Sequence, residues 1–263
     1  MSEVLLNVEA HGVARITLNR PEVNNAYNGA MIDGLLDAQN ALAARDDVRV
    51  IVLQGNGRHF QAGADLTWID EVRRSSAQNN AEVSARTARA VDQLNHAPVP
   101  TVALVQGGCF GGGTGIVAAC DCVIAADDAL FSIAEVRWGL TGAIIVPQLN
   151  DAIGIRQVRR YALTGERFDA HEARRIGLVH EVVARDELEA AGTRMVASLL
   201  ENAPEAIAQT KATILAHADG MLDAAALQAL VDAHAAKRQS DEAVEGLASF
   251  KEKRAANWSP RVG

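Results

Sequence analysis

Aromatic side chains and positive charge are both scarce in this chain of 263 residues. Phe, Trp and Tyr make up 4% of the sequence, and 25 Lys and Arg residues face 33 Asp and Glu residues, giving a formal net charge of −8. Single-stranded bases need aromatic platforms, and phosphate backbones attract basic surfaces. We therefore expect no nucleic-acid partner. Because 49% of the residues are hydrophobic, we expect a folded core of small aliphatic side chains in helices and sheet.

Cysteine is also rare. The chain has a C-x-C pair and one further cysteine: Cys109, Cys120 and Cys122. An odd number without a C-x-x-C excludes a disulfide framework and a zinc knuckle, so buried reduced thiols are predicted. Three histidines lack the spacing of metal ligands: His59, His171 and His180. No metal site is predicted.

Long apolar runs are missing as well. No stretch reaches the roughly 18 uninterrupted apolar residues of a transmembrane helix. The N-terminal segment MSEVLLNVEAHG lacks the basic start and the apolar run of a secretory signal. We expect no contact with membranes and a cytoplasmic location.

The first part of the chain alternates strand and helix patterns. Residues 3–19 form two alternating apolar segments, which predict a hairpin. Asn28 is placed to cap a helix, and residues 48–55 have the continuous apolar pattern of a buried parallel strand. The polar loop 55–66 then leads into one long helix, predicted over about 67–95.

Glycines crowd the segment after the next predicted strand, 101–107. Six of the nine residues from 107 to 115 are glycine, at a turn into a helix that precedes a strand at 121–126. Three interpretations are open. Backbone N–H groups at the helix start could bind an anion or oxyanion, GTGIVA could be a dinucleotide pattern G-x-G-x-x-A, or the glycines could serve close helix-to-sheet packing. The dinucleotide pattern lacks its expected acidic residue at the end of the next strand.

The loop FQAGADL offers a second candidate donor. Its small residues Ala62, Gly63 and Ala64 follow a strand, so a backbone N–H here could lie beside one from the glycine turn. Two such donors make an oxyanion hole. The same loop suits an ordinary turn in which Asp65 caps the next helix, and both interpretations are compatible.

The chain from about 184 to 257 has an almost wholly helical pattern. The predicted start of one helix and two predicted breaks fall at Pro204, Gly220 and Gly246. No Ser/Gly linker separates this tail from the rest. We therefore expect a core at 1–200 and a helical oligomerisation region at 201–263.

Five sequence segments occur in the order typical of one family. They are LNRPEVNNA, FQAGADL, the stretch P-x-x-A-x-V-x-G-x-x-x-G-G-G, CDCVIAADDALFSIAEVRWGL and LTGERFDAHEARRIGLVHEVV. Over nearly its whole length the chain resembles the crotonase, or enoyl-CoA hydratase/isomerase, superfamily. The resemblance implies an α/β fold, a crotonase-like spiral of ββα units with two nearly perpendicular sheets. It also implies C-terminal helices that build a homotrimer or a homohexamer.

The resemblance further implies an acyl-CoA thioester substrate and the groups that bind it. In such proteins the thioester carbonyl lies between two backbone N–H groups, which by motif position are those of Ala64 and Gly112. The hydratases commonly use two glutamates, whose positions here hold Gly115 and Glu135. Glu135 is thus the implied catalytic acid/base, and Gly115 is expected to open space beside the substrate's β-carbon for a branch or a second carboxylate. No cofactor is required, because coenzyme A is part of the substrate.

A finer resemblance concerns the acyl group. GGGTGIVAACD, FSIAEVRWGL and AIGIRQVRRYALTGERFDA are most similar to hydratases of 3-methylglutaconyl-CoA and isohexenylglutaconyl-CoA. These act in leucine and acyclic-terpene degradation, and a glycine in place of the first glutamate is usual among them. One departure is Gly142, where the family often has proline, and it affects the shape of the acyl pocket.

Further residues are assigned to the substrate site by motif position. The expected contacts come from Ala62, Asp65, Leu66, Trp68, Gly115 and Trp138. From a neighbouring subunit, Phe250 and Lys253 in SFKEKR are expected to reach the CoA. The structural alternatives are core packing for the tryptophans and an exposed helix position for Lys253. Arg137 is left open between a substrate carboxylate and a surface salt bridge.

The sequence thus predicts a lyase that adds water to a branched 2-enoyl-CoA. A single carboxylate also suffices for an enoyl-CoA isomerase, and loss of the first glutamate is compatible with a CoA-binding protein without catalysis. The net charge of −8 requires that positive charge be concentrated locally where anionic CoA binds.

Overall fold

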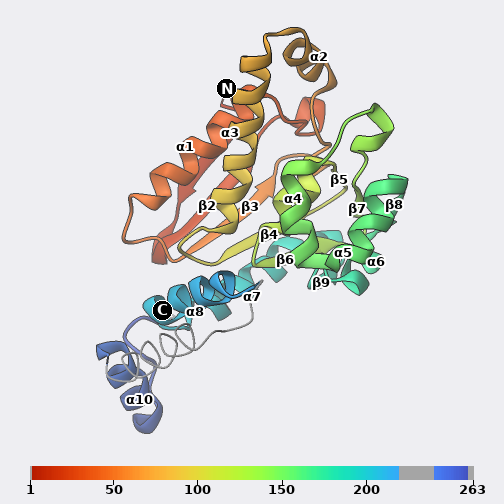
Figure 1. Cartoon of the computed structure of the whole chain (residues 1–263). Helices are drawn as coiled ribbons and strands as arrows, with labels where there is room; N and C mark the ends of the chain where they lie inside the picture. The colour runs from red at the N-terminus through yellow and green to blue at the C-terminus, as the bar shows by residue number, and fades with distance from the viewer. Residues whose placement is uncertain (1, 219–239, 260–263) are drawn as a thin grey trace.

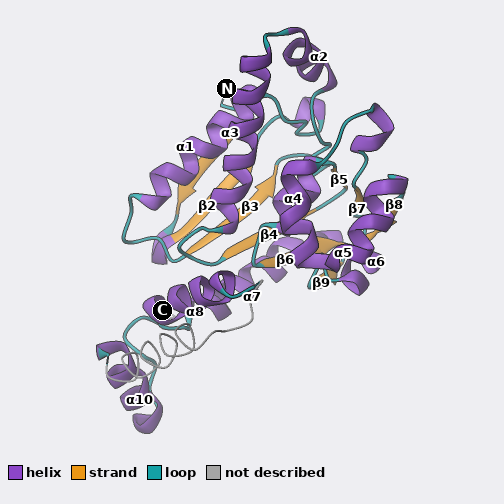
Figure 2. Cartoon of the chain, in the orientation of Figure 1, coloured by secondary structure: helices purple, strands orange, loops and turns teal. Residues whose placement is uncertain are grey.

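The computed structural model describes residues 2–218 and 240–259. Two sheets and the helices around them form the fold (Figure 1), and strands and helices alternate along the chain (Figure 2). The α/β class predicted from the sequence is therefore confirmed. In spatial order the larger sheet holds β1 (Val4–Val8), β2 (Val13–Leu18), β3 (Val50–Gly55), β4 (Thr101–Val105), β6 (Cys122–Ala126) and β9 (Glu181–Val183). The smaller sheet holds β5 (Gly108–Phe110), β7 (Leu130–Ser132) and β8 (Arg167–Asp169).

The larger sheet is parallel except at one edge. β1 and β2 pair antiparallel, with Val4 opposite Leu18, which confirms the predicted hairpin. The other neighbouring strands pair parallel. Parallel strands are normally covered on both faces, and every residue of β4 is buried. This burial explains the continuous apolar patterns at 48–55 and 101–107.

Helices cover both faces of the larger sheet. One face, with Leu53, packs against α1 (Gly29–Ala43) and α3 (Ala77–Asn95). The other face, with Leu104, packs against α7 (Leu188–Leu200). Each fully buried leucine on these faces stabilises the fold by about 1.5–3 kcal/mol. The sheet is thus the central layer, and its strand ends carry the loops of interest.

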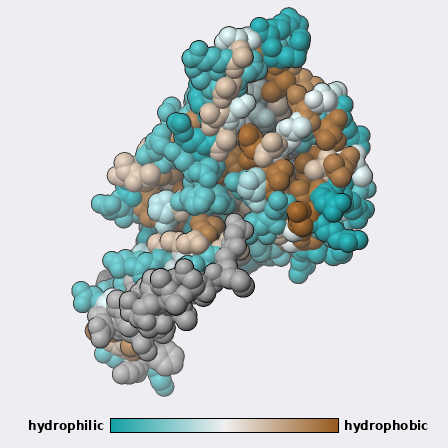
Figure 3. Space-filling model, viewed as in Figure 1, coloured by the Kyte–Doolittle hydropathy of each residue, from teal (hydrophilic) through white to brown (hydrophobic). Residues whose placement is uncertain are grey.

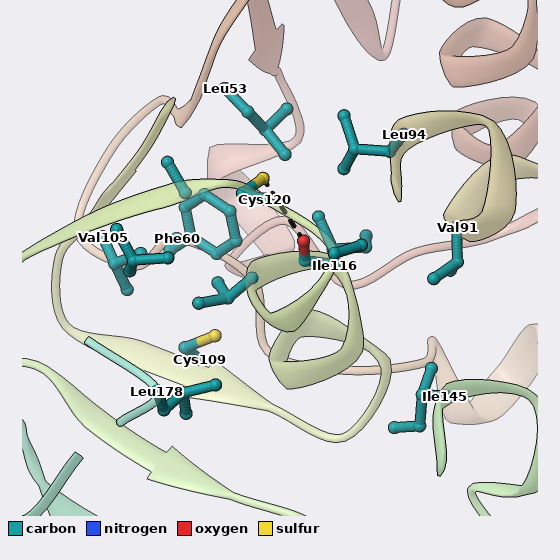
Figure 4. Close-up of a cluster of buried hydrophobic side chains, with 14 of the residues drawn as sticks. Leu53, Phe60, Val91, Leu94, Val105, Cys109, Ile116, Cys120, Ile145 and Leu178 are labelled. Atoms are coloured by element: carbon teal, nitrogen blue, oxygen red, sulfur yellow. Dashed lines mark hydrogen bonds between the residues drawn. The ribbon is translucent and has the colours of Figure 1, made fainter. Parts of the chain in front are cut away.

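The smaller sheet and its helices close the core on one side. These helices are α4 (Gly112–Ala118), α5 (Val146–Thr164) and α6 (Ala170–Ile176). Figure 4 shows Cys109 and Cys120 among the apolar side chains of the buried cluster that joins the two sheets. All three cysteines are free. Cys109 and Cys120 are buried as predicted, whereas Cys122 is half-buried. Burial raises the pKa of Cys120 to about 12, so its thiol stays protonated at neutral pH.

The single helix predicted over 67–95 is wrong. The segment forms α2 (Leu66–Arg74) and α3, separated by two serines. Ser75 donates its backbone N–H to Val72, which ends α2, and the Ser76 side chain accepts from the Asn79 N–H, which starts α3. Serine side chains compete with the helix for backbone hydrogen bonds. Short 3-10 helices also occur: η1 (Ala10–Gly12), η2 (Pro21–Val23), η3 (Glu135–Trp138), η4 (Ala143–Ile145) and η5 (Arg185–Glu187).

The C-terminal region is helical where the structure describes it. α8 (Pro204–Ala216) begins at the predicted proline, and α10 (Asp241–Glu252) follows later. The break predicted at Gly246 is wrong, because this glycine lies inside α10, where a Cβ would be 3.4 Å from the Trp258 ring. The break predicted at Gly220 lies outside the described residues.

An ion pair between a buried lysine and a partly exposed aspartate fixes α8 to the larger sheet. Lys211 is 8% exposed, and its Nζ lies 2.7 Å from Asp121 Oδ2. The same oxygen accepts from the Thr101 backbone N–H and hydroxyl. α8 and α10 extend from one end of the sheet (Figure 1). Across residues 2–218 and 240–259, none of the helices has the length and apolar character needed to span a bilayer.

The segment after the hairpin is held by Asn25, which is fully buried. Its backbone φ is +56°, in the left-handed region that asparagine tolerates. Its Oδ1 accepts from the Arg20 N–H at 2.8 Å, and its Nδ2 donates to the carbonyls of Asn56 at 2.9 Å and His59 at 2.8 Å. One side chain therefore joins the end of β2 to the loop after β3.

The adjacent Asn24 offers a matched control, since it has the same φ of +56° but is exposed. We expect Asn25→Ala to lower the free energy of unfolding by about 3 kcal/mol, because three buried partners lose their hydrogen bonds. Asn24→Ala should lower the free energy of unfolding by only about 1 kcal/mol, because its single effect is to place an alanine in the left-handed backbone conformation. Urea denaturation of both variants measures the difference, and equal losses would contradict the anchoring role of Asn25.

Candidate active site

The loop after β3 is aligned by backbone pairing with Tyr27. The Tyr27 N–H donates to the Gly63 carbonyl at 2.8 Å, and the Asp65 N–H donates to the Tyr27 carbonyl at 2.9 Å. In a parallel bridge of this kind the middle residue, here Ala64, turns its own N–H away from the partner. The Ala64 N–H has no acceptor within the described chain. It is therefore free to bind a ligand.

A second bridge places this loop against the glycine segment. The Phe110 N–H donates to the Gln61 carbonyl at 2.9 Å, and the Gln61 N–H donates to the Gly108 carbonyl at 3.1 Å. Gly63 has φ +88°, and a Cβ there would lie 3.3 Å from the Phe110 carbonyl oxygen. The glycine therefore permits both the turn and the close approach.

The glycine turn itself brings backbone close to three side chains. A Cβ on Gly111 would lie 3.0 Å from Glu135 Oε1, one on Gly112 would lie 2.9 Å from Tyr27 Cε1, and one on Gly113 would lie 2.8 Å from Gln61 Oε1. The Gly111 N–H donates to Ser132, but the Gly112 N–H, at the start of α4, has no acceptor among the residues described. Tyr27 thus adjoins both unpaired amides, since it pairs with the backbone around Ala64.

These positions decide between the interpretations of the glycines. Gly111 and Gly112 allow side chains to approach the turn, as an oxyanion site requires. Gly113 and Gly115 lie within α4 and are buried against neighbouring side chains, so packing accounts for them. The dinucleotide pattern begins at Gly113, already inside the helix and past the turn that its first glycine should make. It has no structural counterpart here.

Glu135 lies at the start of η3, half-buried beside the glycine turn. Its Oε2 is buried and has no hydrogen-bond partner among the described residues. Burial raises the pKa of this carboxyl group above its ordinary value, despite a lowering backbone hydrogen bond. A carboxyl group with a raised pKa beside unpaired amides is suited to proton transfer.

Tyr27 was not predicted from the sequence. Its ring packs edge-on against Trp68, with centroids 5.8 Å apart at 69°. Burial, and secondarily the charge of Glu135, raises the pKa of Tyr27 to about 12. The available signal was its position directly after the motif LNRPEVNNA in a chain with two tyrosines.

The other residues predicted to contact the substrate differ in their burial and in their hydrogen-bond partners. Ala62 is half-buried and donates its N–H to Asn24, and Leu66 is 49% exposed at the start of α2. Asp65 caps α2 through the Thr67 and Trp68 N–H groups. It also pairs with Arg20 at 3.3 Å. The expected capping role of Asp65 is thereby confirmed.

Trp138 and the residues near it lie toward the surface. Trp138 is 62% exposed, so the single chain does not bury it as a pocket wall. The Arg137 side chain packs against Gly165, where a Cβ would lie 2.8 Å from Arg137 Nε. Lys253 is exposed just after α10, and the Phe250 side chain lies outside the described residues.

The space expected beside Gly115 is absent, and this expectation is wrong. A Cβ on Gly115 would lie 2.1 Å from Ile145 Cγ2 and 2.4 Å from Ile145 Cβ. Ile145 is 2% exposed and comes from the segment after η3. A buried isoleucine therefore occupies the volume where a second carboxylate or a substrate branch was expected.

Metal binding has no candidate in the described part of the chain. No group of three or more His, Cys, Asp or Glu side chains there is arranged to hold an ion. The site offers two amide donors, a carboxyl group and a phenol. Paired donors stabilise a carbonyl oxygen that gains negative charge, and a neighbouring carboxylate moves protons.

Comparison with known proteins agrees with this chemistry. A model of the enoyl-CoA hydratase/isomerase family matches residues 9–261. A putative enoyl-CoA hydratase of Thermus thermophilus is 34% identical over 251 residues, which are 95% of this chain and 98% of that protein. A mitochondrial Delta(3,5)-Delta(2,4)-dienoyl-CoA isomerase of Dictyostelium discoideum is 31% identical over an aligned region that covers 92% of this chain and 86% of that protein. The solved structure of Pseudomonas aeruginosa AtuE has a TM-score of 0.93 at 37% identity, covering 98% of this chain and 100% of that one. The expected spiral fold is confirmed.

The packing at Gly115 gives a stability test. We expect Gly115→Ala to lower the free energy of unfolding by about 1–3 kcal/mol, because the new methyl group overlaps Ile145. Gly246→Ala is the matched control, since it is another helix glycine and its Cβ would make an ordinary contact at 3.4 Å. It should be neutral or stabilising by up to about 1 kcal/mol. Thermal denaturation distinguishes them, and an undiminished stability of Gly115→Ala would show that the space is open.

Proposed function

Because this chain belongs to the enoyl-CoA hydratase/isomerase family, we propose that it adds water across the double bond of a 2-enoyl-CoA. The observation that carries the proposal is the convergence of three groups beside Tyr27. The Ala64 and Gly112 amides lack acceptors in the described chain, and the half-buried Glu135 carboxyl group lies against the neighbouring Gly111. This arrangement matches the needs of a thioester carbonyl and the carbons next to it.

The proposed reaction uses one carboxylate twice. The carbonyl oxygen accepts from the amides of Ala64 and Gly112, which stabilise the enolate that forms when water adds. The Glu135 carboxylate takes a proton from water as the water oxygen bonds to the β-carbon. The protonated Glu135 then delivers this proton to the α-carbon, and the carbonyl is restored. Glu135 ends in its starting state, so no second glutamate and no cofactor are needed.

We propose a branched acyl group such as 3-methylglutaconyl or isohexenylglutaconyl. The support is the sequence likeness of 111–121 and 131–140 to hydratases of those thioesters. Since Ile145 fills the space at Gly115, the branch has to lie elsewhere. Gly142 also lies beside the Glu135 carboxyl group, but a Cβ there would lie 3.3 Å from Ile145 Cγ1 and 3.4 Å from Glu135 Cδ. Ile145 therefore borders both glycines.

Isomerisation of an enoyl-CoA is the second candidate. Glu135 is a single carboxyl group, and the same proton shuttle moves a double bond if the proton comes from carbon instead of water. The relative from Dictyostelium discoideum is named an isomerase. Mass spectrometry of the products separates the two reactions, since hydration adds the mass of one water and isomerisation adds none.

We also propose that the chain works in the cytoplasm as a homotrimer or homohexamer. Apolar side chains gather on the face over α4 and α5 (Figure 3). Ile155 and Leu163 on α5 are 67% and 72% exposed, and Ile214 on α8 is 64% exposed. Such exposed apolar positions favour a covering subunit, which could also bring Lys253 to a neighbour's CoA. Sedimentation equilibrium tests this assembly, and the mass of one chain, 27.9 kDa, would contradict it.

Glu135→Gln tests the reaction. We expect it to lower kcat by about a hundredfold or more, because the amide cannot accept and return the proton. Glu187→Gln, at an exposed position in η5, is the matched control and should retain full activity. Turnover is measured on a panel of enoyl-CoA thioesters with straight and branched acyl groups. Unchanged turnover of every substrate by Glu135→Gln would refute the mechanism.

The pH profile is the second arm of this test. Glu135 acts first as a carboxylate, and burial raises its pKa. Protonation therefore removes the base as pH falls through the raised pKa, so the acid limb of kcat/KM should lie above about 4.3, the ordinary glutamate value. A limb at or below that value would count against Glu135 as the base.

A further inference from the structure

Glu135 and Tyr27 have unused hydrogen-bonding capacity at the site, and so does Gln61, whose side-chain amide is buried without a partner in the described chain. Glu135 Oε2 is buried without a partner among the described residues. Tyr27 is half-buried, and its hydroxyl makes no hydrogen bond to the described part of the chain. Buried polar groups are almost always hydrogen-bonded, to protein or to an ordered molecule. The chain's other tyrosine shows the ordinary case, because the Tyr161 hydroxyl donates to Glu172. Glu135 Oε2 therefore indicates a polar species beside it. The two groups, this oxygen and the Tyr27 hydroxyl, are both free to bind that species.

The two groups adjoin successive residues of the glycine turn. The carboxylate of Glu135 lies against Gly111, and the ring of Tyr27 lies against Gly112, at 3.0 and 2.9 Å from the Cβ positions. Adjacent α-carbons are about 3.8 Å apart, so the carboxylate and the aromatic ring border one short stretch of backbone. Trp68, packed edge-on, and Gly112 fix the orientation of the Tyr27 ring.

The chemistry of the pair is complementary. The pKa of Tyr27 is about 12, so its phenol stays protonated at neutral pH and can donate a hydrogen bond. The ionised Glu135 can only accept. A water molecule between them would accept a hydrogen bond from the phenol and donate one to the carboxylate. No second carboxylate at position 115 is available to hold this water, because that residue is a glycine and Ile145 fills the space beside it.

We propose that Tyr27 is a catalytic residue that holds the reacting water for Glu135. The inference rests on the proposed hydration. The Tyr27 hydroxyl donates to the water oxygen and directs one water proton at the Glu135 carboxylate. As the oxygen bonds to the β-carbon, that proton passes to Glu135 and then to the α-carbon, while the phenol keeps its own proton. All atoms and charges balance, and Tyr27 leaves the cycle unchanged.

The experiment compares two reactions that need different parts of the site. Hydration of crotonyl-CoA and 3-methylglutaconyl-CoA needs the held water. Exchange of the α-protons of butyryl-CoA in D₂O needs Glu135 and the oxyanion hole but no water at the β-carbon. Tyr27→Phe keeps the ring and removes the hydroxyl. We expect kcat for hydration to fall about tenfold to a hundredfold, with α-proton exchange and the Kd for butyryl-CoA within about twofold of wild type.

Tyr161→Phe is the matched control, since it removes the other phenol, whose hydroxyl donates to Glu172, and it should retain both reactions. Glu135→Gln should lose both. The inference would be overturned if Tyr27→Phe hydrated the substrates with the wild-type kcat. It would also be overturned if hydration and α-proton exchange were lost equally, which would indicate a structural role for the hydroxyl. If the wild-type protein shows neither reaction, the proposed function itself fails, which is a distinct result.

Discussion

The backbone pairing between Tyr27 and the segment around Ala64 is the contact on which the rest of the site depends. It uses the N–H and carbonyl of Tyr27 to align the residues on each side of Ala64, and so leaves the Ala64 N–H unpaired. The ring of the same tyrosine lies against Gly112, which supplies the second free amide. Tyr27 therefore adjoins both amide donors, although Ala64 and Gly112 are far apart in the sequence. Asn25 holds the segment that contains Tyr27 in place.

Unpaired buried groups destabilise a fold by about 1–3 kcal/mol each. The chain accepts this cost at Glu135 Oε2, which lies beside the same turn as the unpaired amides of the half-buried residues Ala64 and Gly112. Donors that are already oriented need no rearrangement when charge develops on a bound oxygen, which is how such sites lower a reaction barrier. The same desolvation that raises the pKa of Glu135 would strengthen its interaction with the proton transferred in the proposed reaction. The unpaired groups thus lower the stability of the fold and are already oriented for the proposed reaction.

Local sequence patterns predicted the parts of the fold that depend on neighbouring residues. The hairpin follows from alternation of apolar residues, and Asn28 caps α1 by accepting from the Met31 N–H at 2.9 Å. Asp65 caps α2 in the same way. The break between α2 and α3 was missed because apolar periodicity does not report serine side chains that compete for backbone groups.

Two features of the site depend on contacts that no local pattern encodes. Ile145 fills the space at Gly115, although a glycine at that position read alone indicates an opening. Tyr27 reaches Gly112 only because the spiral brings the first loop beside the glycine turn. Motif position singled out Glu135, and the structure places its carboxyl group beside that turn. It gave no information on the packing around them.

Isotope-edited infrared spectroscopy of a bound thioester tests the central claim most directly, namely that two backbone amides polarise the substrate carbonyl. Crotonyl-CoA labelled with carbon-13 at the carbonyl is bound to Glu135→Gln, which should turn it over much more slowly than the wild-type protein. The carbonyl stretch should move to lower frequency on binding, because the Ala64 and Gly112 amides remain in place. An unshifted carbonyl frequency in the saturated complex would contradict the account.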